Sequence, residues 1–335
     1  MKKFLLLLLC TLLFSSLLLG CNEESESSLA EDSLQSSQTE QSEQSTQETL
    51  TRPESISIVV LGDSIARGAT LASPEADSYS AKLCELLKND YKQVSVKNCG
   101  IDGQTGAELL QALKSSPAPE LYNCDYIVVS IGGNNILQFL TSLEGADDFL
   151  ASVGPETFAN YFRYIIAKTE EEKQSLKGAC DIISQAFGSL NSAYASEQFS
   201  GLIDTASEKL RSEIPQIVSA LKSINPKAKI LFQTVYNPYK DMVLKLKDVS
   251  EILDMHANGE TAVTRLNSPI TELASELGYT VIDVYSEFAD SIKTLTFAGL
   301  DTQKASFSLD PHPNEKGHEL IAQLFYNYLT EKNDG

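Results

Sequence analysis

The amino-acid sequence predicts a three-layer α/β/α fold, in which helices cover both faces of a parallel β-sheet. Three observations support this prediction. Short β-branched apolar runs recur along the chain, helical patterns lie between them, and 42% of the 335 residues are hydrophobic, which is enough for a sizeable core. Strands that are buried on both faces have such continuous apolar runs, so the sheet is expected to be parallel and covered on both sides.

Five apolar runs are the predicted strands, and four segments between or after them are predicted helices. The strands span Ile56–Leu61, Val94–Val96, Tyr126–Ile131, Lys229–Val235 and Tyr279–Tyr285. The helices span Tyr79–Leu87, Thr105–Leu113, about Val263–Leu277 and about Asn314–Leu329. Functional residues of parallel sheets lie at the carboxyl ends of the strands, so the residues that follow each run are the candidates for a site.

A helical insertion is predicted at about residues 140–226, because about 90 residues separate the third strand from the fourth. Within it, apolar side chains recur at the i, i+3, i+4 and i+7 spacing of one helix face. They are Phe158, Tyr161, Phe162 and Ile165. Packing in a core is the favoured interpretation of this stripe. The alternative is a helical cap over the mouth of a site.

The first fifty residues are predicted to lie outside the folded domain. Lys2 and Lys3 precede the 16-residue apolar run Phe4–Leu19, which is shorter than the roughly 20 residues of a membrane-spanning helix and typical of an export signal. The run ends in Leu18–Cys21 (LLGC), which resembles a bacterial lipobox. That resemblance implies cleavage before Cys21 and a diacylglyceryl group on its sulfur. An ordinary secretory signal with an incidental cysteine is the alternative.

Residues 22–50 lack Lys and Arg and consist mostly of Ser, Gln, Thr, Glu and Asp, so they cannot bury enough apolar area to fold. The predicted organisation is a signal peptide at residues 1–20, a lipid-anchor cysteine with a solvated tether at 21–52, and a folded domain at 53–335. This organisation places the protein on a cell membrane, at its extracytoplasmic face.

Charge and composition exclude several classes of protein. The net charge of −20 and the pI near 4.5 disfavour binding to nucleic-acid phosphates. Three histidines are too few for a histidine-rich metal cage, and no CxxC spacing occurs, so we expect no metal. Beyond Cys21 the chain has Cys84, Cys99, Cys124 and Cys180, which we expect to be buried free thiols.

Polar, glycine-rich segments follow the first three strands, and another lies near the C-terminus. They are Gly62–Gly68, Asn98–Thr105, Gly132–Asn135 and Asp310–Asn314. Together they offer a serine hydroxyl, backbone N–H groups, a side-chain amide and an imidazole, which are the parts of serine-based acyl transfer. Each segment alone has a structural interpretation: Ser64 as a helix cap, Asn135 as a turn residue, and Asp63 as an acceptor for loop amides.

In combination, these segments resemble the four sequence blocks of the SGNH hydrolases, also called the GDSL lipase and esterase family. The blocks occur in family order across about Ile56–Leu329. The resemblance implies that Ser64 is the nucleophile and His312 the general base. It also implies an oxyanion hole made by the backbone N–H groups of Ser64 and Gly103 and by the side-chain amide of Asn134.

The residues themselves also favour His312 as the base. His318 is expected in the first turn of a helix, where the dipole disfavours imidazolium, and His256 lies far from every segment. Flanking prolines restrict the backbone around His312. The family places a carboxylate three residues before this histidine, where the chain has Leu309.

Asp310 lies only two residues before His312. Because a residue before proline favours an extended backbone, Asp310 and His312 should face the same side. Asp310 is therefore the predicted partner of the ring. A backbone carbonyl such as that of Leu309, which would leave a Ser-His dyad, is the alternative.

The sequence thus predicts a five-stranded, flavodoxin-like sheet that carries a serine hydrolase site. The expected function is a surface-anchored esterase or lipase that cleaves carboxylic esters, either acyl lipids or small acyl esters, without a metal or organic cofactor. Its expected partners are the ester substrate and, through Cys21, the membrane, and we expect a monomer. A non-catalytic ligand-binding lipoprotein is the alternative; an adhesive surface protein is disfavoured because no internal repeat occurs.

Overall fold

The computed structural model describes residues 54–135, 153–292, 294–301 and 306–331. The predicted signal peptide and tether lie outside the described residues, as does the predicted insertion up to residue 152. Among the described residues, no helix combines the length and the apolar composition that crossing a bilayer requires.

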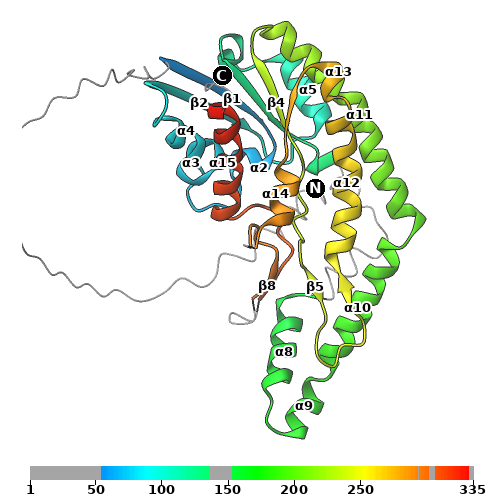
Figure 1. Cartoon of the computed structure of the whole chain (residues 1–335). Coiled ribbons are helices and arrows are strands. Elements are labelled where there is room, and N and C mark those ends of the chain that lie inside the picture. The colour runs from blue at the N-terminus through cyan, green and yellow to red at the C-terminus, as the bar shows by residue number, and fades with distance from the viewer. Residues whose placement is uncertain (1–53, 136–152, 293, 302–305, 332–335) are drawn as a thin grey trace, which may run out of the picture. The chain divides into compact units, whose positions relative to one another are not determined.

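A five-stranded parallel sheet lies at the centre of the fold (Figure 1). Its strand order is β2-β1-β3-β4-β7, the flavodoxin-like order predicted from the sequence. The strands are β1 (Ser55–Gly62), β2 (Gln93–Gly100), β3 (Tyr126–Ser130), β4 (Lys229–Gln233) and β7 (Thr280–Ile282). All five predicted strands are present, and the predicted fold class is confirmed. The last strand is shorter than predicted, since it ends at Ile282, and Val284 and Tyr285 are helical because Asp283 caps a helix that begins there.

Helices cover both faces of this sheet, because the side chains of each strand alternate between the two faces. In β1, Ile58 and Val60 pack into the core beneath α4 (Tyr79–Leu87) and α15 (Glu315–Glu331), whereas Val59 and Leu61 enter the opposite core. That opposite core is covered by α5 (Gly106–Ser115), α11 (Glu197–Ile224) and α12 (Met255–Glu272), which Figure 1 shows on the other side of the sheet. The result is the expected α/β/α layering.

The segment predicted as one insertion has two structural parts. Helix α11 belongs to the sheet-covering layer, since Leu210, Ile214 and Ile217 are buried in the same core as β1, β3 and β4. The second part is α8 (Pro155–Ile166), α9 (Glu170–Leu176) and α10 (Gly178–Tyr194). Helices α8 and α10 enclose a separate apolar core with the chain around β5 (Val243–Leu244) and β6 (Leu253–Asp254), and we call these elements the lobe.

Two aromatics of the predicted helical stripe lie inside the lobe. Phe158 and Tyr161 are 1% and 4% exposed, and both pack in the core of the lobe. Phe162 is partly buried against it, whereas Ile165 at the end of α8 is exposed. The buried pair therefore agrees with the interpretation of the stripe as core.

The remaining elements are short. They are α2 (Ser64–Arg67), α3 (Pro74–Asp77), η1 (Pro119–Tyr122), α13 (Ala274–Leu277), α14 (Val284–Asp290), β8 (Gly299–Asp301) and β9 (Ser306–Ser308). The predicted helix at Val263–Leu277 corresponds to α12 and α13 and begins earlier than expected, where Asp254 caps the backbone N–H of Ala257.

Candidate active site

Ser64 lies directly after β1, where the chain makes a sharp exit from the sheet. Gly62 adopts a φ of 151°, and a Cβ at this position would lie 2.2 Å from the carbonyl oxygen of Ser130 in β3. Only glycine fits this close approach. The next residue, Asp63, caps α2 by accepting a hydrogen bond from the backbone N–H of Ile65 at 2.9 Å. Ser64 is therefore the first residue of a short capped helix at the carboxyl edge of the sheet.

The structure brings Ser64 and His312 into hydrogen-bonding contact, although 248 residues separate them. The distance from Ser64 Oγ to His312 Nε2 is 2.9 Å. The other ring nitrogen, Nδ1, lies 2.6 Å from Asp310 Oδ1. The same carboxylate oxygen accepts the backbone N–H of His312 at 3.0 Å, so Asp310 contacts both the backbone and the ring of this residue.

Asp310, not a backbone carbonyl, is the partner of the inner ring nitrogen. The carbonyl of Leu309, which was the alternative, accepts the hydroxyl of Tyr239 at 3.2 Å instead. The side chains of His312 and Asp310 are 23% and 17% exposed, so their contact is largely shielded from water. The two-residue spacing is thus sufficient for the carboxylate of Asp310 to reach the ring of His312.

The arrangement can transfer a proton away from Ser64. With the Asp310 carboxylate accepting from a protonated Nδ1, the lone pair of Nε2 faces the Ser64 hydroxyl. A base in this position can remove the hydroxyl proton while the oxygen forms a bond to an electrophilic carbon.

The other two histidines lie elsewhere. His318 is fully buried in α15, and its Nδ1 accepts the backbone N–H of Tyr79 at 3.2 Å. Burial lowers the pKa of His318 to about 3, with smaller contributions from the charges of His312 and Lys82. The helix dipole was the only cause expected from the sequence, and this burial was not foreseen. His256 lies in α12 and accepts the backbone N–H of Asp241 at 3.3 Å.

The predicted oxyanion donors lie on the segments that follow β1, β2 and β3. Gly103 has a φ of 74°, a left-handed conformation that favours glycine. The amide nitrogen of Asn134 lies 3.3 Å from Asp63 Oδ2 and 3.4 Å from the carbonyl oxygen of Gln104. Both distances are longer than the usual 2.9–3.0 Å of a strong N–H···O bond. Asn134 therefore lies beside the residue that precedes Ser64.

Asp63 is a buried carboxylic acid next to this site. Its side chain is 2% exposed, and burial raises its pKa to about 6, although the N–H of Ile65 and the charge of His312 act in the opposite direction. The sequence interpretation of Asp63 as an acceptor for loop amides agrees with its contact to Ile65. Its contact with Asn134 was not foreseen.

A second buried carboxylate, Glu213, was missed in the sequence. It lies on α11, is 5% exposed, and accepts the side-chain amide of Asn135 at 2.9 Å. The side-chain oxygen Oδ1 of Asn135 accepts the backbone N–H of Gly106 at 3.1 Å. These contacts join α11, the segment after β3 and the start of α5, so the structural interpretation of Asn135 agrees with its position.

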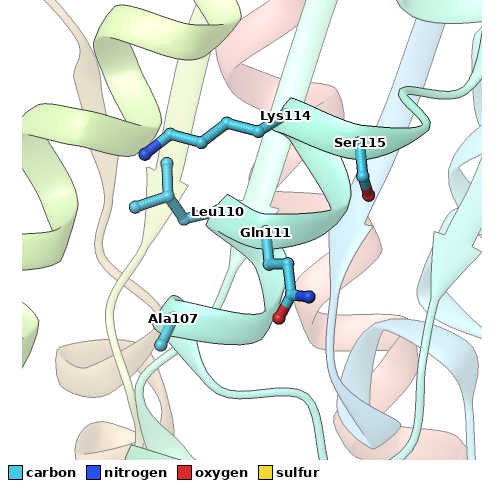
Figure 2. A pocket seen from close by; sticks show the side chains of 5 residues that line it. All are labelled: Ala107, Leu110, Gln111, Lys114 and Ser115. Carbon is cyan, nitrogen blue, oxygen red and sulfur yellow. The ribbon is translucent and has the colours of Figure 1, made fainter.

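Other candidate sites are weak. In the described part of the chain, no group of three or more His, Cys, Asp or Glu side chains is arranged to hold a metal ion. Cys84, Cys99, Cys124 and Cys180 are free thiols, of which Cys124 and Cys180 are buried and the other two partly exposed. A depression of about 350 Å³ lies along α5 and is lined by Ala107, Leu110, Gln111, Lys114 and Ser115 (Figure 2). All five residues project from that single helix, and none of them contacts Ser64 or His312 in the hydrogen-bond network above.

Comparison with known proteins identifies the family. YpmR of Bacillus subtilis strain 168, an uncharacterized protein, is 20% identical over 289 residues, which is 85% of each chain. The lipase Lip_vut3 from a goat rumen metagenome is 17% identical over 81% of this chain and 95% of its own, with a TM-score of 0.47. An extracellular lipase from Streptomyces rimosus is 15% identical over 82% of this chain and 99% of its own, with a TM-score of 0.48. Residues 60–320 match the sequence profile of the GDSL-like lipase/acylhydrolase family, and the chain therefore belongs to that family.

Proposed function

We propose that this protein is a serine esterase that hydrolyses carboxylic esters through an acyl-enzyme, with Ser64, His312 and Asp310 as its catalytic residues. The observation that carries the proposal is the 2.9 Å contact between Ser64 Oγ and His312 Nε2, supported by the 2.6 Å contact between Nδ1 and Asp310. Membership of the lipase/acylhydrolase family supports the same class of reaction.

Acylation begins when Ser64 Oγ attacks the ester carbonyl and its proton passes to His312 Nε2. The oxyanion accepts hydrogen bonds from the N–H groups of Ser64 and Gly103 and from the Asn134 amide. Collapse breaks the bond to the alcohol, which leaves with the proton from His312. Water then attacks the acyl-enzyme by the same route and releases the acid.

The hydrogen bonding of the three proposed oxyanion donors supports this part of the proposal. Among the described residues, neither the backbone N–H of Ser64 nor that of Gly103 donates to a protein acceptor, and the Asp63 carboxylate accepts the N–H of Ile65 rather than that of Ser64. In the same described part of the chain, the Asn134 amide makes only the long contacts to Asp63 and Gln104. A negatively charged oxygen is a better acceptor than either of these, so Asn134 can turn toward it.

We further propose that the esterase domain is attached to the outer face of a cell membrane through a lipid on Cys21. The lipobox-like Leu18–Cys21 and the polar residues 22–50 support this part of the proposal. Acyl lipids or small acyl esters are the proposed substrates, and the reaction needs no metal or organic cofactor.

Hydrolysis of p-nitrophenyl acetate by the purified protein tests the proposal, followed by p-nitrophenyl esters of graded chain length. Ser64→Ala should lower kcat by at least about 10⁴-fold, because the nucleophile is lost. Ser175→Ala, on the exposed surface of α9, is the matched control and should keep full activity. A wild-type protein without esterase activity, or a fully active Ser64→Ala variant, would refute the mechanism and favour a ligand-binding lipoprotein.

Asp310→Asn tests the third residue separately. An orienting carboxylate fixes the tautomer of the ring and stabilises the imidazolium, so the change should lower kcat by about 10³- to 10⁴-fold. If most of the activity remained, the reaction would depend on Ser64 and His312 alone.

A further inference from the structure

The segment Leu309–His312 has to be held by tertiary contacts, because it belongs to neither a helix nor a strand. Pro311 contributes no N–H group, so a regular hydrogen-bond ladder could not include it fully. The position of the segment Leu309–His312 nevertheless decides whether the His312 ring reaches Ser64. The groups that hold this segment are therefore candidates for a role in the reaction.

Two tyrosines from the loop after β4 hold the carbonyl groups on either side of Asp310. The hydroxyl of Tyr236 donates to the carbonyl oxygen of Pro311 at 2.8 Å. The hydroxyl of Tyr239 donates to the carbonyl oxygen of Leu309 at 3.2 Å. Both donors come from the carboxyl edge of the sheet, the edge that also carries Ser64.

Tyr236 is rigidly placed. It is 2% exposed, and its ring stacks on Phe288 with the ring centroids 4.2 Å apart. Burial, together with the charges of Asp63 and Asp310, raises the pKa of its hydroxyl well above the ordinary value. Tyr236 therefore remains a hydrogen-bond donor at any pH at which the enzyme would work.

The two tyrosine contacts belong to a wider connection between the same loop and the histidine segment. Thr296 donates from its hydroxyl to the carbonyl oxygen of Pro238, which lies between the two tyrosines, and pairs with Pro313 in an isolated β-bridge. The backbone N–H of Phe297 donates to the carbonyl oxygen of His312 at 3.0 Å. The carbonyl groups of Leu309, Pro311 and His312 are thus each fixed by a donor outside the segment.

We propose that Tyr236 and Tyr239 are positioning residues, whose hydroxyl groups hold the Leu309–His312 segment so that the Asp310–His312 pair meets Ser64. The inference rests on the proposed esterase mechanism. Neither tyrosine touches the reacting atoms in this role. They act on the reaction by limiting the directions in which the His312 ring can point.

The test uses substitutions that remove one hydroxyl group and keep the ring: Tyr236→Phe, Tyr239→Phe and the double variant. Tyr279→Phe is the matched control, because the hydroxyl of Tyr279 also donates to a backbone carbonyl, that of Ile270 at 2.6 Å. Ile270 belongs to α12 and not to the histidine segment. Loss of one neutral hydrogen bond that aligns the base should lower kcat by about three- to tenfold for Tyr236→Phe, with KM unchanged within about twofold. Tyr239→Phe should have the smaller effect, because its hydrogen bond is longer.

A second measurement does not require turnover. In protein with ¹⁵N-labelled histidine, the exchange of the His312 Nδ1 proton with solvent reports how firmly the ring is held against Asp310. Exchange should be faster in Tyr236→Phe than in the wild type and unchanged in Tyr279→Phe. A purely structural role of Tyr236 would lower the melting temperature without this selective change.

The outcomes separate the inference from the proposed function. If the wild type hydrolyses esters in a Ser64-dependent manner, both kcat and proton exchange must change in Tyr236→Phe. A variant that matches Tyr279→Phe in either measurement overturns the inference. If the wild type has no Ser64-dependent activity, the proposed function fails, and the proton exchange alone decides whether the tyrosines hold the segment.

Discussion

At the scale of single residues, the site depends on a few polar groups whose surroundings differ sharply. Asp63 and Asp310 lie close to the same histidine, yet Asp63 is buried with a pKa of about 6, whereas Asp310 is partly exposed and contacts the ring directly. Two residues of the same type thus differ through their environments: Asp63 is a buried acid that caps a helix, and Asp310 is a carboxylate in contact with the His312 ring.

Asn134→Ala is expected to lower kcat by about a hundred- to a thousandfold, with a modest effect on KM. One oxyanion donor would be lost, and such donors stabilise the transition state more than the bound substrate. Steady-state kinetics on a p-nitrophenyl ester would show this, with Asn327→Ala on the exposed face of α15 as the control. An Asn134→Ala enzyme with unchanged kcat would remove Asn134 from the oxyanion hole.

The buried Asp63 is expected to make stability depend on pH. The folded protein holds this proton up to about pH 6, whereas the unfolded chain releases it near the reference value of 3.8. Between these values the folded state binds more protons, so the free energy of unfolding falls as the pH rises, by about 1.4 kcal/mol per unit at most.

Urea unfolding at pH 5.0 and pH 7.5 would measure the effect for the wild type and Asp63→Asn, in which the cap is kept. The wild type should lose about 1 kcal/mol more than the variant between these two pH values. Equal losses in both proteins would mean that Asp63 ionises as freely in the folded state as in the unfolded chain.

Much of the site could be predicted from single residues, because its chemistry is carried by short segments. Ser64, His312 and Asp310 lie together, as the local patterns and the family resemblance led us to expect. Tyr236 and Tyr239 could not be foreseen, since a tyrosine in a loop has no periodic signal and its partners lie 75 and 70 residues away. Glu213 was missed for a different reason, because a charged residue in a helical pattern is normally solvent-exposed.

At the scale of secondary-structure elements, α11 does more than cover the sheet. Its Glu213 connects it, through Asn135, to the segment after β3 and to the start of α5. The two segments that carry Asn134 and Gly103 are thereby held by one buried group of hydrogen bonds. Burial raises the pKa of Glu213, which is consistent with its position between these elements.

Glu213→Ala is expected to destabilise the protein by about 2 to 3 kcal/mol, because a buried hydrogen bond and part of the packing around it are lost. Glu213→Gln keeps an acceptor oxygen and should cost less. The control is Glu208→Ala, on the exposed side of the same helix, with an expected change within about 0.5 kcal/mol. Urea denaturation measures all three, and equal stabilities of Glu213→Ala and Glu208→Ala would show that the buried contact contributes nothing.

The long elements were predictable, whereas the short ones and their packing were not. The strands and helices of the sheet have apolar patterns several residues long, but β5, β6, β8 and β9 have two or three residues each and show no usable alternation. The helical pattern between β3 and β4 was recognised, but a pattern does not tell which core a helix joins. This is why α11 was grouped with the helices of the lobe.

At the scale of the whole molecule, the proposal joins the folded domain to a membrane through a tether and a lipid anchor on Cys21. Cys21→Ala is expected to move the protein from the membrane fraction to the soluble fraction, because the proposed lipid is attached to the sulfur of Cys21. The value of kcat on a soluble ester should stay within about twofold, since the described site contains no residue from this region. Detergent-phase partition and the intact mass would measure the anchor; a Cys21→Ala protein that stays in the membrane fraction would contradict it.

The short spacing between Asp310 and His312 affects how the site responds to mutations elsewhere in the fold. The acid and the base sit on one piece of chain and form their mutual contact locally, so any displacement of that piece carries both of them together. The distance between this pair and the Ser64 hydroxyl, in contrast, is set by long-range folding, because 248 residues separate Ser64 from His312. A mutation that shifts this whole segment against β1 would therefore lengthen the distance from Ser64 Oγ to His312 Nε2 before it breaks the contact between Asp310 and His312.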